Sequence, residues 1–353
     1  MKKTIIAAVA AGVLAGCGGG GGSSSTTTGP GSSASQAPAV ALIAAPGVVG
    51  AGTFVPTGDT VTDTLAYINN MRAQVGLPPL ASQPGVAQAA TNHSLWEQDN
   101  NTVGHYETSG QPGYTGYSPL DRVNLYDSTD SVGEVTAGFS GPFASSTEAI
   151  EALFDAPFHR TVMLFDSVYA GVGVANAATT SQLSTLTVDF ASYKPFIADP
   201  QLVAWPYNSM TGVDTSWFAN ESPNPMAASP AYEDTVVGYP VTLSGGDNAA
   251  FSNVKFAITD ATGAPVACQE TDSSNNAEAT REAMCVPFSP LKTSMTYKVN
   301  VTGSLSNTSL GATPFSVSWS FTTAAAANTP IGAPTTSATR AFRQVQPRQI
   351  LLN

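Results

Sequence analysis

Residues 69–80 read NNMRAQVGLPPL, and this stretch closes a helix that the sequence predicts at the start of its first folded domain. Apolar residues recur along this helix at helical spacing, at Val61, Leu65, Ile68, Met71 and Val75. Thr60 is the expected N-cap, with Asp63 three residues later. Gly76 stops the helix, and the prolines that follow at 78 and 79 prevent its return.

Mixed helix and strand patterns continue downstream. A second helix is predicted over 84–100, and a third over 145–156 that Pro157 ends. The segments AGVGVA (170–175) and STLTVDFASY (184–193) alternate as strands do. The first folded domain, which we place at 59–205, is therefore predicted to be α+β.

The balance of charge excludes one class of partner. The chain has 353 residues, with 13 basic and 25 acidic side chains and a formal net charge of −12. Five of the basic residues lie at the extreme ends of the chain, at 2, 3, 340, 343 and 348, so the body is more acidic still. Such a surface repels phosphate backbones, and we expect no nucleic-acid partner.

The N-terminus, MKKTIIAAVAAGVLAGC, predicts export. A basic start and a short apolar run are typical of a signal peptide over 1–17. The ending LAGC resembles the lipobox of bacterial lipoproteins, which implies cleavage before Cys17 and a lipid on its thiol. Gly18 rather than aspartate follows, so we expect an outer-membrane location if the cell has two membranes. The alternative is an ordinary secretory signal with an incidental cysteine.

A flexible tether is expected next, because residues 18–58 are rich in Gly, Ser, Thr and Pro. Beyond the first domain we expect a connector over 206–228, a small all-β sandwich over 229–323 and a disordered tail over 324–353. The segments PVTLSG, FAITDATGAPV and SWSFTT resemble Ig-like bacterial surface modules. Cys268 and Cys285 are the two cysteines left in an exported chain, which predicts a disulfide.

The candidate chemistry gathers in the first domain. The chain has only three histidines, His93, His105 and His159. Acidic and basic residues accompany them in the same segments: Arg122, Glu134, Asp155 and Arg160. Imidazoles beside a carboxylate bind a divalent metal such as zinc, or exchange protons near neutral pH.

Six short motifs occur in a recognisable order. They are NNMRAQVGLPPL (69–80), AATNHS (89–94), GHY (104–106), PLDR (119–122), GEV (133–135) and APFHR (156–160). This order resembles the bacterial secreted branch of the CAP superfamily of SCP-like proteins (cysteine-rich secretory, antigen 5, pathogenesis-related-1). The resemblance covers 59 to about 195 and implies an α-β-α sandwich with a cleft lined by two histidines and acidic residues. By position, His105, Glu134 and His159 line that cleft.

Two positions depart from the family pattern. The second acidic residue of the family falls near Ala156, although Asp155 is adjacent, and Val135 replaces an asparagine in the GEV turn. His93 is either a buried structural histidine or a further cleft ligand. Arg122 is expected to be an ion-pair partner, and Arg160 can orient acidic groups in the same way.

The leading hypothesis is a surface-anchored, non-enzymatic CAP lipoprotein that binds a small molecule, a lipid or another envelope ligand. The Ig-like module would be a spacer or an adhesion partner. The alternative is a hydrolase of peptides or envelope polymers that uses His159 and Glu134, with or without a metal. No framed nucleophile such as G-x-S-x-G accompanies the histidines, which favours the binder. A third interpretation is purely structural, with these residues holding a loop-rich segment together.

Overall fold

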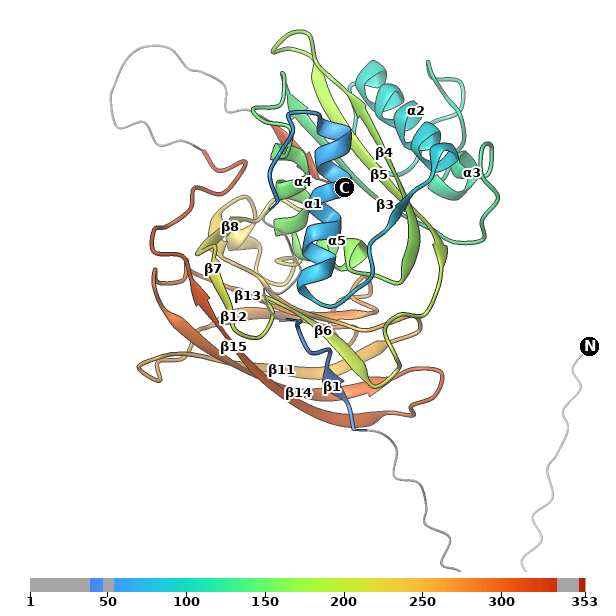
Figure 1. Cartoon of the computed structure of the whole chain (residues 1–353). Helices are drawn as coiled ribbons and strands as arrows, with labels where there is room; N and C mark the ends of the chain where they lie inside the picture. The colour runs from blue at the N-terminus through green and yellow to red at the C-terminus, as the bar shows by residue number, and fades with distance from the viewer. Residues whose placement is uncertain (1–38, 47–53, 335–348, 353) are drawn as a thin grey trace, which may run out of the picture. The chain divides into compact units, whose positions relative to one another are not determined.

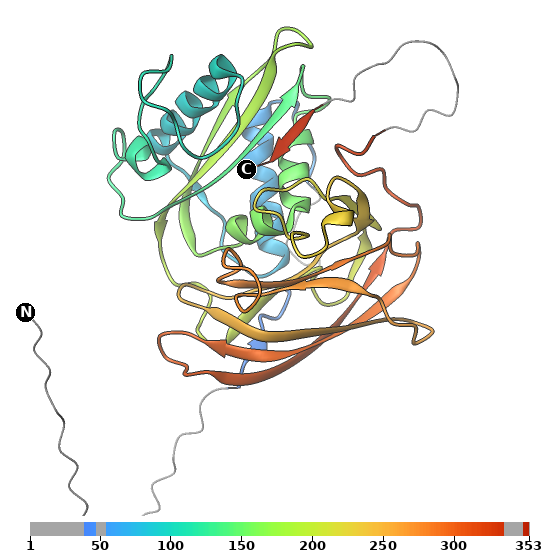
Figure 2. The ribbon, with the colours of Figure 1, turned by 180° about the vertical axis from the view of Figure 1, so that it is seen from behind.

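The computed structural model describes residues 39–46, 54–334 and 349–352, which fall within one compact unit. An α+β domain is followed by a region rich in β-sheet (Figures 1 and 2). Cys17, the signal peptide and most of the predicted tether lie outside the described residues. Within the described ranges, no helix has the length and apolar character needed to cross a membrane.

The first domain is built on a sheet with the strand order β16-β3-β5-β4-β2. Its elements are β2 (Ala81–Ser82), β3 (Val132–Ser140), β4 (Ser167–Ala175), β5 (Leu183–Tyr193) and β16 (Ile350–Leu352). β3, β5 and β4 are antiparallel neighbours, whereas β2 joins β4 in parallel. This sheet carries the site, because one of its strands presents Glu134.

Helices cover both faces of this sheet, as Figures 1 and 2 show. α2 (Pro84–Asn100) lies directly on β4, where two glycines permit the contact: a Cβ at Gly171 would lie 2.1 Å from the main-chain nitrogen of Ala87. A Cβ at Gly173 would collide equally with Ala90. α3 (Pro119–Val123) accompanies α2, and the remaining helices are α1 (Thr60–Gln74), α4 (Glu148–Asp155) and α5 (Pro157–Met163).

Helix termini differ from the sequence prediction in two places. Asp59, not Thr60, is the N-cap of α1, because its carboxylate accepts a hydrogen bond from the main-chain N–H of Thr62 (2.8 Å). Pro157 does more than end α4: it occupies the first turn of α5, a position that suits proline because it needs no N–H there. His159 therefore lies on a short helix of its own.

The β-rich region consists mainly of two sheets, ordered β1-β6-β10-β13-β12 and β11-β14-β15-β7. Their strands are β1 (Ala41–Leu42), β6 (Gln201–Trp205), β7 (Met210–Val213), β10 (Val241–Ser244), β11 (Ala250–Asp260), β12 (Cys268–Thr271), β13 (Glu282–Pro287), β14 (Thr296–Ser306) and β15 (Thr313–Thr323). The β-rich region also contains a two-stranded antiparallel sheet, formed by β8 (Ser216–Phe218) and β9 (Val236–Gly238), and a 3-10 helix (Pro230–Tyr232). The predicted disulfide between Cys268 and Cys285 is confirmed, and it links β12 to β13.

The structure corrects several of the expected segment boundaries. β6 belongs to the β-rich region rather than to 59–205, and β7 and β8 lie within the expected connector. β1 lies in the expected tether and β16 in the expected disordered tail. These strands are two to five residues long. β1, β7 and β16 are edge strands, β6 is the neighbour of the edge strand β1, and β8 belongs to a two-stranded sheet. Main-chain hydrogen bonds hold them there, and such bonds leave little pattern in side-chain hydrophobicity.

Candidate functional site

A cavity of about 190 Å³ lies between the first domain and the β-rich region. Its first-domain wall comprises His105, Glu134, Phe158, His159, Thr161 and Val162. The opposite wall comprises Ser222, Pro223, Glu278, Thr280, Arg281 and Glu282. We call this cavity the seam pocket. The three residues that the sequence grouped as cleft candidates, His105, Glu134 and His159, thus line one cavity.

His105 and Glu134 form the first half of the site. Nδ1 of His105 lies 2.9 Å from Oε1 of Glu134, and Nη2 of Arg122 donates to Oε2 of the same carboxylate at 2.5 Å. Glu134 projects from β3, so its GEV segment is a strand and not the turn that the resemblance implied. Burial alone would raise the pKa of Glu134, but His93, His105 and Arg122 together lower it. The carboxylate is therefore ionised and accepts a hydrogen bond from His105 Nδ1.

His159 and Glu221 form the second half. Oε1 of Glu221 accepts from the main-chain N–H of His159 at 2.8 Å and lies 2.7 Å from its Nδ1. Both side chains are almost completely buried, at 4% and 0% exposure. Glu221 follows β8, inside the expected connector. This chain has alanine at 156, near the family's second acidic position, and the carboxylate beside His159 comes from outside the first domain.

The two histidines present the same chemistry to the pocket. Because each Nδ1 faces a glutamate oxygen, each Nδ1 carries the proton and each Nε2 carries the lone pair in the neutral ring. Among the described residues, neither Nε2 has a hydrogen-bond partner. Both Nε2 atoms are therefore available to accept a hydrogen bond from a ligand.

The wall supplied by the β-rich region carries mixed charge. The guanidinium of Arg281 lies 3.8 Å from the ring centre of Phe165, and its buried Nη1 has no partner in the described part of the chain. Burial lowers the pKa of Arg281. Burial also raises the pKa of the neighbouring Glu282 to about 7. This wall therefore contains a buried guanidinium with one unpartnered nitrogen, next to a carboxyl group whose pKa lies near neutral pH.

His93 lies beneath the site rather than in it, because its side chain is completely buried. Its Nδ1 lies 3.0 Å from Glu107 Oε1, and its Nε2 lies 2.9 Å from the carbonyl oxygen of Gly104. Two oxygen acceptors require both ring nitrogens to carry protons, so His93 is an imidazolium. Burial opposes this charge, but Glu134, Glu107 and Glu97 raise its pKa. Of the two interpretations left open by the sequence, the buried one describes this geometry.

Two further buried carboxyl groups escaped the sequence analysis. Burial raises the pKa of Glu97, on α2, to about 7. Asp189 lies directly opposite Glu134 across β3 and β5, and both of its oxygens are buried without a partner among the described residues. Burial and the adjacent Glu134 raise the pKa of Asp189 well above its usual range. An ionised Glu134 therefore disfavours ionisation of Asp189.

Asp155 and Arg160 serve the seam rather than the pocket. Arg160 donates to the carbonyl oxygens of Phe154 and Asp155 in its own domain and of Pro240 in the β-rich region. Oδ1 of Asp155 accepts from the hydroxyl of Tyr239 at 2.9 Å. Phe154 packs edge-on against Trp205 at 4.8 Å. Asp155 is adjacent to Ala156 in sequence, but its carboxylate is bonded to Tyr239 and does not line the seam pocket.

A resident zinc ion does not fit the residues that the structure describes. Catalytic zinc sites take three protein ligands and structural sites take four. Within the described ranges, no group of three or more His, Cys, Asp or Glu side chains is placed to hold an ion. The seam pocket offers two imidazole nitrogens, while the carboxylates beside them, Glu134 and Glu221, are engaged by the Nδ1 atoms of the two rings and by Arg122. We therefore derive no chemistry through a metal.

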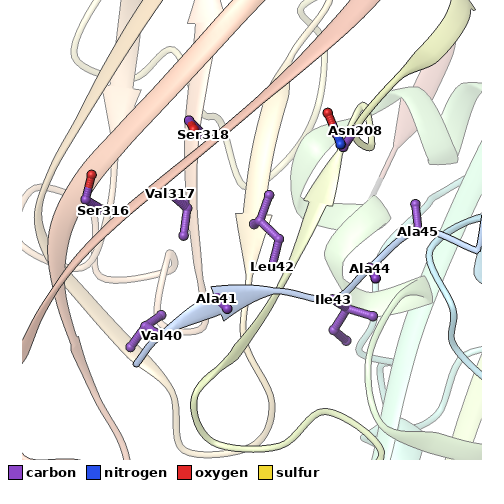
Figure 3. A pocket seen from close by; sticks show the side chains of 10 residues that line it. All are labelled: Val40, Ala41, Leu42, Ile43, Ala44, Ala45, Asn208, Ser316, Val317 and Ser318. Carbon is purple, nitrogen blue, oxygen red and sulfur yellow. The ribbon is translucent and has the colours of Figure 1, made fainter. Parts of the chain in front are cut away.

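A larger cavity of about 380 Å³ lies away from this chemistry. It is lined by Val40, Ala41, Leu42, Ile43, Ala44, Ala45, Asn208, Ser316, Val317 and Ser318 (Figure 3). Its walls come from β1, from the chain on either side of β1, from β15 and, at Asn208, from the chain between β6 and β7. No titratable side chain lines it, so it has none of the acid–base or ligating chemistry of the seam pocket.

Comparison with known proteins agrees with the architecture of the first domain. Residues 65–190 match the cysteine-rich secretory protein family, CAP, so this part of the chain is a CAP domain. No curated protein matches the chain. The family match ends before β6, and a separate β-rich region follows it.

Solved structures resemble parts of the chain at low identity. An outer surface protein from Borrelia burgdorferi is 18% identical with a TM-score of 0.32, over 40% of this chain and 97% of that one. An extracellular protein with an SCP domain from Bacillus anthracis is 21% identical with a TM-score of 0.31, over 37% of this chain and 40% of that one. CopC from Methylosinus trichosporium is 17% identical with a TM-score of 0.23, over 35% and 91%. At these scores the likenesses carry no argument about function.

Proposed function

We propose that this protein is an exported, envelope-anchored binder that holds a small or lipid-like ligand, or one end of a larger one, in the seam pocket. The observation that carries the proposal is the pair of histidines, each held at Nδ1 by a glutamate and each free at Nε2. Phe158, Val162 and Pro223 add apolar wall between these polar groups. An apolar cavity with a few oriented polar groups is the usual form of a ligand site.

The size of the pocket limits what it encloses. Its volume of about 190 Å³ is below the roughly 300–1,000 Å³ typical of sites that bury a whole drug-sized molecule. The pocket therefore takes a small head group or one end of a chain, and the remainder of a larger ligand lies outside. The β-rich region, which we propose is Ig-like, is a wall of the site rather than a distant spacer.

Export and anchoring rest on two features. A disulfide between Cys268 and Cys285 persists in an oxidising compartment. The lipobox-like LAGC sequence at Cys17 supplies the anchor in this proposal, and Gly18 favours an outer-membrane location if the cell has two membranes.

A hydrolase is the second candidate, and the His159–Glu221 pair is the observation that favours it. A histidine oriented by a carboxylate, with Nε2 open to a pocket, has the arrangement of a general base. Against it, no hydroxyl or thiol among the described residues is hydrogen-bonded to either Nε2. Nucleophilic hydrolysis requires such a partner or an activated water.

The test is native mass spectrometry of the purified protein after exposure to a chloroform–methanol extract of the bacterial envelope. We expect a retained mass in the wild type that is lost in His105→Ala/His159→Ala and weakened in Glu221→Gln. Glu233→Gln, at an exposed glutamate, is the matched control and should retain the mass.

A chelator arm and a turnover arm separate the alternatives. Retention should be unchanged by EDTA, because the pocket lacks a third metal ligand. If the wild type releases product from peptide, ester or glycan substrates and Glu221→Gln abolishes that release, the hydrolase hypothesis would be supported over the binder hypothesis. Equal retention in the wild type and in the double histidine variant would refute the pocket as the site.

A further inference from the structure

The long segment 102–118 between α2 and α3 has neither helix nor strand, yet it is firmly held. Its anchor is the carboxylate of Glu107, which is 1% exposed. Oε2 of Glu107 accepts from the main-chain N–H groups of Thr115 and Gly116 at 2.6 and 3.2 Å. Irregular loops longer than about 15 residues inside a compact domain are uncommon, and ordered ones are usually functional.

This loop displays tyrosines to solvent. Tyr106 and Tyr117 are each 59% exposed, and their rings stack on one another with centroids 4.9 Å apart. Tyr114, between them in sequence, is 39% exposed. Arg122 fixes the pair from below, because its Nη1 donates to the carbonyl oxygens of His105 and Tyr117. Two rings held in the open in this way form a preorganised surface, which we call the tyrosine platform.

Charge decides which kind of partner the platform fits. Glu107 is the only charged residue in 106–120, and it is buried. The domain around it contains no lysine from residue 4 to 193, and its three arginines, Arg72, Arg122 and Arg160, are completely buried. A surface without exposed basic groups cannot attract polyanions or an anionic lipid surface.

The exposed polar side chains of the loop are uncharged, and the carboxylate that follows it, Asp121, accepts hydrogen bonds from Ser118. Thr108, Ser109 and Gln111 are exposed on the same loop and offer hydroxyl and amide groups. Tyrosine supplies a large, rigid, amphipathic contact area at low entropic cost. Ring faces stack on the C–H face of a sugar, while hydroxyl and amide groups bond to its hydroxyls. We propose that the tyrosine platform binds a neutral polysaccharide, at a site separate from the seam pocket.

The experiment is affinity electrophoresis of the purified chain in native gels that contain dextran, soluble β-glucan or hydroxyethylcellulose. We expect at least one neutral polysaccharide to retard the wild type. Tyr106→Ala/Tyr117→Ala should raise the dissociation constant by about tenfold or more, equivalent to about 1.4 kcal/mol of lost stacking. Tyr106→Phe/Tyr117→Phe should stay within about threefold, because it keeps both ring faces.

Two controls isolate the platform. Tyr193→Ala removes an exposed tyrosine elsewhere in the domain and should not change retardation. His105→Ala/His159→Ala should also bind polysaccharide normally, so failure of the proposed ligand pocket and failure of this proposal are distinguishable. The proposal is overturned if no neutral gel retards the protein, or if the double alanine variant is retarded like the wild type. The proposal is also overturned if the tyrosine platform binds only polygalacturonate or only phosphatidylcholine vesicles.

Discussion

The His159–Glu221 pair should couple the two parts of the chain more strongly than any surface ion pair. Glu221 is completely buried and accepts two hydrogen bonds from His159, at 2.7 and 2.8 Å. Glu221→Ala leaves two buried donors unpaired, and breaking a buried pair in this way costs about 3–5 kcal/mol of the free energy of unfolding. Glu221→Gln keeps one acceptor and should cost about 1–2 kcal/mol.

A double-mutant cycle isolates the part of this loss that belongs to the pair. The His159→Ala variant keeps the main-chain hydrogen bond to Glu221, so the cycle reports the ring contact alone. We expect a coupling energy of about 2 kcal/mol, measured by urea unfolding followed through tryptophan fluorescence. Trp205 is a suitable reporter because it packs against Phe154 in the seam.

Lys255 and Glu270 provide the matched control. Their side chains meet at 2.8 Å, nearly the same distance, but Lys255 is 75% exposed. Exposed pairs are typically worth less than about 1 kcal/mol, so the Lys255→Ala/Glu270→Ala cycle should give a much smaller coupling. A His159–Glu221 coupling no larger than that of the surface pair would refute the reasoning.

Three further predictions concern the supports of the site. Deleting 349–353 should lower the free energy of unfolding, measured in urea, by about 1.5–3 kcal/mol. The deletion removes the buried side chain of Leu352 and the carbonyl oxygen that accepts a hydrogen bond from the N–H of Ser222, next to Glu221. An unchanged unfolding midpoint would show that β16 is dispensable. Burial raises the pKa of Glu97 from 4.5 to about 7, so its carboxyl group binds a proton more tightly in the folded state than in the unfolded chain. As pH rises from about 4.5 to 7, Glu97 should therefore lower the free energy of unfolding by up to about 3 kcal/mol. Glu97→Gln should flatten that part of the pH profile measured by thermal unfolding, and a profile identical to the wild type would contradict the assignment. Cys268→Ser/Cys285→Ser should lower the free energy of unfolding, measured by calorimetry, by roughly 3 kcal/mol, the chain-entropy value for the short loop that the disulfide closes. An unchanged free energy of unfolding would contradict this prediction.

Much of the fold could be predicted from local patterns. The helix before Gly76, the helix that carries His93 and the long alternating strands all occur near the expected residues, because periodic burial leaves a strong signal. The short strands β1, β7, β8 and β16 could not be predicted. They owe their conformation to main-chain pairing with segments that lie far away in the sequence.

The candidate site divides in the same way. His105 and Glu134 share motifs within one domain, and the structure brings them into hydrogen-bond contact. Glu221 lies 62 residues beyond His159, in a segment rich in proline and asparagine, and no local feature distinguishes it from an exposed glutamate. The sequence left the direction of Asp155 open, because adjacency to Ala156 does not fix where its carboxylate points; the structure bonds it to Tyr239.

The three arginines of the first domain show which roles the sequence could and could not assign. Arg72, Arg122 and Arg160 each occur in a motif, and all three are completely buried. Arg160 was expected to orient acidic groups, but it donates to main-chain carbonyl oxygens instead. Arg122 and Arg160 have different partners, because Arg122 binds Glu134 beneath the pocket whereas Arg160 joins the domain to Pro240. The sequence could not distinguish the two roles, since they depend on which element lies opposite each helix.

The central claim is that a glutamate from outside the CAP domain holds one of two pocket histidines, leaving both Nε2 atoms free. Long-range nitrogen–proton NMR of the imidazole rings tests it directly, and only three histidines contribute signals. We predict protons on both nitrogens of His93, and the Nδ1–H tautomer for the neutral rings of His105 and His159, with His159 alone perturbed in Glu221→Gln. A neutral His159 ring protonated at Nε2, or one that is indifferent to Glu221→Gln, would contradict the account.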